Sequence, residues 1–158
     1  MAAFRLARIL SASLLAFIGF ASSTSCGRTP QANTAHFPYA HVQEGCGPAD
    51  GLALALYFTA KPASCEKYEE PFLMIQIIAN LPKSAPRDYT IGASSRDMLA
   101  SLCQSSGHCM AATSGTLHLT KFTQGKNASG EYELHFRDGS IEKGQFDATW
   151  CVVHFMCG

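Results

Sequence analysis

Seven cysteines constrain this chain more than any other feature, and its first residues decide which chemistry they have. Arg5 and Arg8 precede an apolar run over residues 9–21, and the small residues 22–25 lead to Cys26. A charged region, an apolar region and a small-residue cleavage site are the parts of an export signal. In the oxidising compartments beyond the cytoplasm, cysteines of a small domain typically form disulfides. The pattern therefore predicts an exported, disulfide-stabilised protein.

Cys26 directly follows the small residues, as the acylated cysteine of a bacterial lipoprotein does. Ser25 suits that site, whereas Ser23 stands where leucine is usual, and ordinary cleavage after either serine is the alternative. Setting Cys26 aside as an anchor leaves six cysteines, which can all pair. We therefore predict lipidation of Cys26 as the only link to a membrane, and a periplasmic or outer-membrane surface location. Without the lipid, the protein is expected to be secreted.

Length and composition bound the remaining choices. The chain has 158 residues, so a mature part beginning at Cys26 fits a single domain. Apolar residues make up 47% and charged residues 15% of the chain, which allows a core and argues against disorder. Loss of Arg5 and Arg8 leaves a formal charge of −2, which gives no long-range attraction to nucleic acid. No nucleic-acid partner is expected, and the pattern identifies no protein or small-molecule ligand.

The positions of turn residues, and of segments in which apolar and polar residues alternate, divide the chain into three predicted parts. These are an export signal over 1–25, an irregular tether over 26–44, and one domain over 45–158. Leu52 to Phe58 alternates, and residues 72–79 form a short apolar run between prolines, so both segments are predicted strands. The tether is polar and has no periodicity. Residues 94–102 begin with Ser94 and continue with spaced apolar residues, which favours a short helix.

The C-terminal third has the clearest β pattern. Residues 131–137 alternate apolar and polar side chains, Asp138-Gly139 is a tight-turn signal, and alternation resumes from Ile141. Several short strands with turn chemistry between them predict an all-β fold, or a β-rich one with one short helix. The expected architecture is an antiparallel sandwich or open barrel stapled by disulfides.

The spacing of the cysteines restricts their pairing. Cys103 and Cys109 flank a flexible turn, so we expect them to pair with each other. Cys151 and Cys157 enclose a segment that, if extended, separates them by about 20 Å, too far for a disulfide. By elimination each of these two pairs with Cys46 or Cys65, and the spacing leaves open which goes with which.

Metal binding is the competing interpretation of the same cysteines. Two sets contain plausible donors: Cys103, His108 and Cys109, and Cys151, His154 and Cys157. Neither has the short Cys-x-x-Cys spacing of a zinc knuckle, and the six histidines show no His-x-His or His-x₃-His pair. We therefore predict no metal and no cofactor, and assign the histidines structural or surface roles.

The segment Cys46-Gly47-Pro48-Ala49, which precedes an apolar run, resembles the nucleophile region of papain-like bacteriocin-processing peptidases. There the cysteine opens a helix whose N-terminal dipole favours a thiolate. The resemblance implies Cys46 as a nucleophile with a histidine base and an orienting acid, either His118 with Asp138 or His135 with Asp147. The alternative, a disulfide cysteine in a Gly-Pro turn, removes that nucleophile, and we predict no catalytic residue.

A longer resemblance covers about 40 residues from Thr116. The segments 130–139 and 144–151 read G-x-Y-x-L-x-F-x-D-G and G-x-F-x-A-x-W-C. They resemble the closing strands of uncharacterised exported bacterial proteins and lipoproteins. That resemblance implies a β-rich fold and an envelope location, with no known activity attached. The expected role is non-enzymatic, either binding or structural, and a small-molecule-binding barrel is a further alternative.

Overall fold

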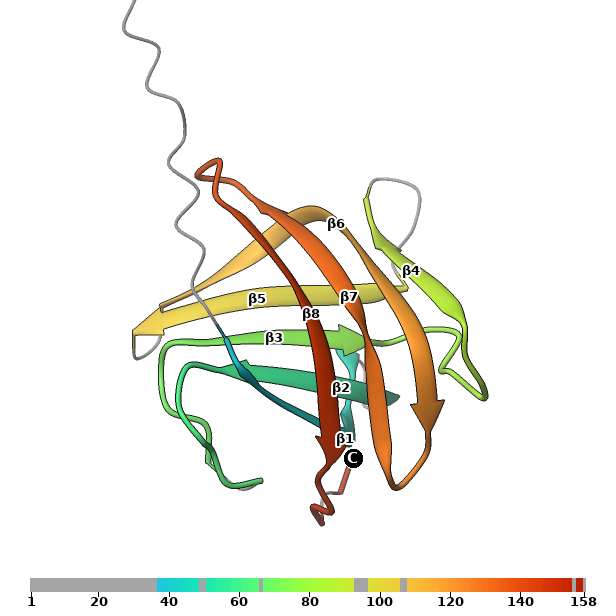
Figure 1. Cartoon of the computed structure of the whole chain (residues 1–158). Helices are drawn as coiled ribbons and strands as arrows, with labels where there is room; N and C mark the ends of the chain where they lie inside the picture. The colour runs from blue at the N-terminus through green and yellow to red at the C-terminus, as the bar shows by residue number, and fades with distance from the viewer. Residues whose placement is uncertain are drawn as a thin grey trace, which may run out of the picture.

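The computed structural model describes residues 37–48, 51–65, 67–92, 97–105, 108–154 and 156–157 (Figure 1). The export signal and Cys26 lie outside these residues. The described residues contain no α-helix, and so no helix long and apolar enough to cross a bilayer. They form eight β-strands: β1 (Tyr39–Cys46), β2 (Leu52–Thr59), β3 (Phe72–Ile77), β4 (Arg87–Ile91), β5 (Met98–Ser105), β6 (His108–Thr123), β7 (Asn127–Phe136) and β8 (Ile141–Trp150). The all-β, disulfide-linked fold predicted from the sequence is confirmed.

Seven of the strands close into a barrel in the order β1-β2-β3-β5-β6-β7-β8, and β4 lies outside it against β6 (Figure 1). Every neighbouring pair is antiparallel except β1 and β8, which run in the same direction. Seven strands cannot alternate in direction all the way round a closed ring, so one parallel pair is required. The first and the last strand form that pair, through His41 opposite Thr149 and Val42 opposite Trp150.

β6 is long and pairs with three other strands. Its first part pairs with β5, and its later part pairs with β4 on one side and β7 on the other. The β6–β7 ladder shifts register twice, between Ala112 and Ser114 and between Leu119 and Lys121. Such bulges bend a strand and increase its twist. Figure 1 shows the resulting curve of β6 over the barrel.

The barrel interior is packed with side chains from alternate positions of the strands. On β2 and β3 these are aliphatic or aromatic, and on β7 the inward positions are filled by Ala128, Gly130, Tyr132, Leu134 and Phe136. Phe58 of β2 contacts both Tyr132 and Phe146 across the interior, with ring centroids 4.8 and 5.3 Å apart. The centre is therefore a core, and any ligand site must lie at an end or on the outside.

Two sequence predictions are wrong in detail. Residues 39–44, assigned to an irregular tether, belong to β1, and Phe37 before them is buried. β1 needs few apolar residues because it lies between β2 and β8 and contributes mainly Val42 to the core. Part of the predicted helix, residues 98–102, belongs to β5, where Met98, Ala100 and Leu102 are buried at alternate positions.

Three disulfides close the structure: Cys46–Cys157, Cys65–Cys151 and Cys103–Cys109. The local pair and the two long-range pairs agree with the expectation from strand geometry, and the structure resolves which long-range partners go together. Cys103 and Cys109 lie opposite each other in the β5–β6 ladder. The two long-range bridges connect the region of β1 and the β2–β3 segment to the residues after β8.

Candidate functional site

A pocket of about 210 Å³ opens at one end of the barrel. It lies where β1, β6 and β8 end and β2 begins. Because β1 and β8 are parallel, their C-terminal ends lie at the same end of the barrel. The turn after β6 is fixed there by a hydrogen bond from the Trp150 amide to the Lys126 carbonyl, 2.9 Å long. The residues that line the pocket are Glu44, Leu52, Ala53, Leu54, Leu81, Pro82, Lys83, Phe122, Gln124 and Trp150.

Most of the pocket wall is apolar. Phe122 and Trp150 form an aromatic corner, with ring centroids 6.3 Å apart and planes tilted by 60°. Leu54 is buried at the base of the wall, whereas Leu52 is 52% exposed. A partly exposed leucine beside half-buried aromatic rings leaves apolar surface that a ligand can remove from water.

Three polar side chains accompany this apolar wall. The Gln124 amide donates a hydrogen bond to the Glu44 carboxylate, with Nε2 and Oε1 2.8 Å apart. Lys83 contributes an exposed ammonium group to the lining. Few polar groups in an apolar concavity are typical of small-molecule sites, where they orient the ligand. Trp150 packs against the core and remains partly exposed in the pocket, a role that no local sequence motif indicates.

Two larger hollows are shallower candidates. One, of about 400 Å³, lies on the outer face of β6, β7 and β8 and is lined largely by polar and charged side chains, among them His118, Glu131 and Lys143. The other, of about 480 Å³, lies beside the Cys103–Cys109 hairpin and includes His108 and Asp138. Neither combines an apolar wall with a few polar groups as the mouth pocket does. The pocket lined by Phe122 and Trp150 is therefore the best-formed ligand site of these three.

The residues nominated for a cysteine peptidase are not brought together. Cys46 ends β1 and is bonded to Cys157, and the apolar residues after it form β2 instead of a helix. His118 contacts Asp88 instead of Asp138, and the His135 Nε2 lies 3.0 Å from the Glu133 carboxylate. Asp147 accepts a hydrogen bond from Ser129, and Asp138 accepts two from Ser140. Among the described residues, no histidine pairs with Cys46 as a base, and its sulfur is bonded to Cys157.

The sulfur atoms of the two alternative metal sets belong to disulfides. Cys103 is bonded to Cys109, whereas Cys151 and Cys157 are bonded to Cys65 and Cys46. The structure instead gathers a different set, His41, Cys65 and Cys151, whose potential ligand atoms all lie within 4.8 Å of one another. His41 was missed because its contribution depends on two strands that are adjacent only in the closed barrel. Alternation along β1 could have placed His41 on the outer face. The sequence gives no sign that β8, which Cys151 follows, pairs with β1.

A buried polar pair lies inside the barrel beside the hydrophobic core. Tyr132 is 7% exposed and Glu142 is 1% exposed, on the adjacent strands β7 and β8. Burial raises the pKa of the Tyr132 hydroxyl, and the neighbouring Glu142 carboxylate raises it further. Tyr132 therefore remains neutral in the folded protein well above the pH at which an exposed tyrosine ionises.

No protein-family model, curated protein or solved structure matches this chain.

Proposed function

We propose that this protein is exported to the bacterial cell envelope, is held there by a lipid on Cys26, and acts by binding a small molecule without chemical conversion. The export pattern of residues 1–25 and the even number of remaining cysteines support the location. Three disulfides are consistent with an oxidising compartment.

The pocket at the barrel end is the observation that carries the binding role. Its volume, about 210 Å³, suits one or two fused rings or a short alkyl segment, since a cavity of about 150 Å³ holds benzene. Phe122 and Trp150 favour an aromatic or aliphatic body, and Glu44, Gln124 and Lys83 favour a polar head that hydrogen-bonds at the rim. The ligand class is therefore a small amphiphile.

The first test is calorimetric titration of the oxidised protein with four probes: indole, phenethylamine, hexylamine and hexanoate. Ligands of this size, roughly seven to nine heavy atoms, are expected to bind in such a pocket with a Kd on the order of 0.1–1 mM. Trp150 is the chain's single tryptophan, so its fluorescence independently reports binding of the three probes other than indole, which is itself the tryptophan fluorophore. The amines and the carboxylate together identify whether Glu44 or Lys83 selects the head group.

The matched variants are Leu81→Phe, which fills the pocket, and Leu99→Phe, which adds the same ring to a partly exposed site on β5. Leu81→Phe is expected to weaken probe binding at least about tenfold, corresponding to about 1.4 kcal/mol, while Leu99→Phe leaves it unchanged. Absence of saturable binding by all four probes, or equal loss in both variants, contradicts the proposed site.

A further inference from the structure

The outer face of the barrel carries a compact group of one imidazole and two sulfur atoms. His41 lies on β1, Cys151 directly follows β8, and Cys65 lies in the segment between β2 and β3. The Cys151 amide donates to the Val42 carbonyl at 2.7 Å, which continues the parallel β1–β8 pairing by one residue. That register sets His41 and Cys151 on the same side of the sheet, because both alternate with inward-facing neighbours.

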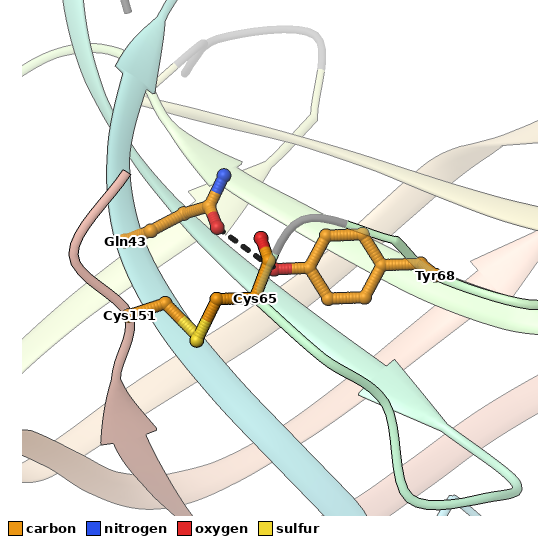
Figure 2. The surroundings of a disulfide bond; sticks show 4 residues. All are labelled: Gln43, Cys65, Tyr68 and Cys151. Atoms are coloured by element: carbon orange, nitrogen blue, oxygen red, sulfur yellow. Dashed lines mark hydrogen bonds between the residues drawn. A yellow bond between two sulfur atoms is a disulfide. The ribbon is translucent and has the colours of Figure 1, made fainter. Parts of the chain in front are cut away.

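Cys65 is held over this face by contacts other than its own disulfide (Figure 2). The ring of Tyr68 stacks on Tyr57 with centroids 3.9 Å apart, and its hydroxyl donates to the Gln43 side-chain oxygen at 2.7 Å. The same hydroxyl lies 3.4 Å from the Cys65 carbonyl oxygen. These contacts do not involve the sulfur atoms, so they keep Cys65 near Cys151 when the disulfide is open.

The His41 Nδ1 atom is buried and has no hydrogen-bond partner among the described residues. A buried imidazole nitrogen without a partner loses its solvation, which a structure normally offsets with a hydrogen bond or a metal. Two cysteines and one histidine form a donor set that favours zinc, with Zn–S bonds of about 2.3 Å and Zn–N bonds of about 2.0 Å. Two tetrahedral Zn–S bonds separate the sulfurs by about 3.8 Å, so opening the disulfide creates the space that the ion needs.

We propose that reduction of Cys65–Cys151 converts this group into a zinc site formed by His41, Cys65 and Cys151, with the fourth position open to water. The disulfide and the metal site are mutually exclusive states of the same residues. In the first step an external dithiol gives two electrons and two protons to the Cys65–Cys151 bond and becomes a disulfide itself. In the second step Zn²⁺ binds both sulfurs and the His41 imidazole, and the two thiol protons are released.

The experiment adds Co²⁺ or Zn²⁺ to the full mature chain after anaerobic treatment with a dithiol, followed by removal of the dithiol. Binding of one Co²⁺ per chain is expected, with thiolate-to-cobalt absorption and the visible bands of tetrahedral coordination. Alkylation and mass mapping then show which sulfurs the metal covers. Zn²⁺ is expected to protect Cys65 and Cys151, while Cys103 and Cys109 react equally with and without it.

His41→Ala is expected to weaken metal binding at least about tenfold, since loss even of a group that only supports a ligand costs 10–100-fold. The matched control is His118→Ala, which removes a partly exposed histidine of the barrel surface and leaves metal binding unchanged. Equal affinity in the two variants, or protection of all cysteines alike, overturns the proposal.

A second variant avoids reduction altogether, in case the fully reduced chain unfolds. Cys65→His cannot form the disulfide but retains Cys46–Cys157 and Cys103–Cys109, and it leaves three donors around the same point. It is expected to bind one Zn²⁺ without a reductant, and adding His41→Ala to it is expected to weaken binding at least about tenfold. A folded Cys65→His chain that takes up no Zn²⁺ also overturns the proposal.

Discussion

At the scale of single residues, the barrel depends on positions where no side chain fits. Gly130 on β7 faces inward beside the bulge of β6, and a Cβ added there overlaps the carbonyl oxygen of His118. The obstacle is backbone of a neighbouring strand, which cannot rotate away as a side chain can. Gly45 on β1 differs, because a Cβ there meets nothing within 4 Å.

Gly130→Ala is therefore expected to lower the free energy of unfolding by about 2–3 kcal/mol, since β6 and β7 must separate to accept the methyl group. Gly45→Ala is the matched control and is expected to change stability by no more than about 0.5 kcal/mol. Denaturant unfolding of both variants measures the difference. Equal stability of the two variants contradicts the close packing of β6 on β7.

At the scale of elements, alternation identified β2, β7 and β8, and a short apolar run between prolines identified β3. β1 was not predicted as a strand, because its own sequence has no β pattern. It is a strand because it pairs with β2 on one side and β8 on the other. β5 was misread because Met98, Leu99 and Leu102 fit a helical spacing as well as a strand. The local sequence pattern cannot decide whether such a segment is a strand or a helix when its pairing partner is distant in the sequence.

The candidate site was less predictable than the fold. Its lining comes from four strands, the segment after β3 and the turn after β6, and no local motif connects Glu44 with Gln124 or Leu81 with Trp150. The disulfide pairing was largely predictable, because an extended strand fixes the distance between its own residues. The choice between the two long-range pairings required the register of β1 against β8, which the sequence alone does not contain.

The disulfides are expected to differ in their effect on stability. Cys46–Cys157 spans 111 residues and Cys103–Cys109 spans 6. Because Cys65–Cys151 is retained, Cys46–Cys157 closes an effective loop of only 25 residues, 19 from Cys46 to Cys65 and 6 from Cys151 to Cys157. Loop entropy then predicts a loss of about 3.5 kcal/mol on replacing this long-range pair by alanine and about 2 kcal/mol on replacing the hairpin pair. Denaturant midpoints of Cys46→Ala/Cys157→Ala and Cys103→Ala/Cys109→Ala, compared with the parent chain, test this order. A larger loss for the hairpin pair contradicts it.

At the scale of the whole molecule, buried tyrosines link stability to pH. Burial raises the pKa of Tyr57, Tyr89 and Tyr132, and raises that of Tyr68 to about 12. Between about pH 10 and these higher values, the unfolded chain has lost protons that the folded chain retains. The free energy of unfolding is therefore constant with respect to these groups below about pH 10 and falls as pH rises above it.

Unfolding measured at increasing alkaline pH is expected to show this loss, with up to about 1.4 kcal/mol per pH unit from each such tyrosine. Tyr132→Phe removes one of the groups, so its stability is expected to decline less steeply than that of the parent chain. The near-ultraviolet absorbance of tyrosinate gives a second readout, rising together with unfolding. An identical slope in the variant and the parent contradicts the raised pKa of Tyr132.

The barrel closes only when the first strand, β1, pairs with the last, β8. β1 precedes β8 by most of the barrel sequence, so one edge of β1 stays without its partner until β8 is in place. Pairings between distant segments also form slowly, because a long loop must be closed first. Until then, the apolar inner faces of β2 and β3 are open to water. The barrel therefore closes only when β8 pairs with β1, and a shortened chain that lacks β8 is left with two unprotected edges prone to aggregation.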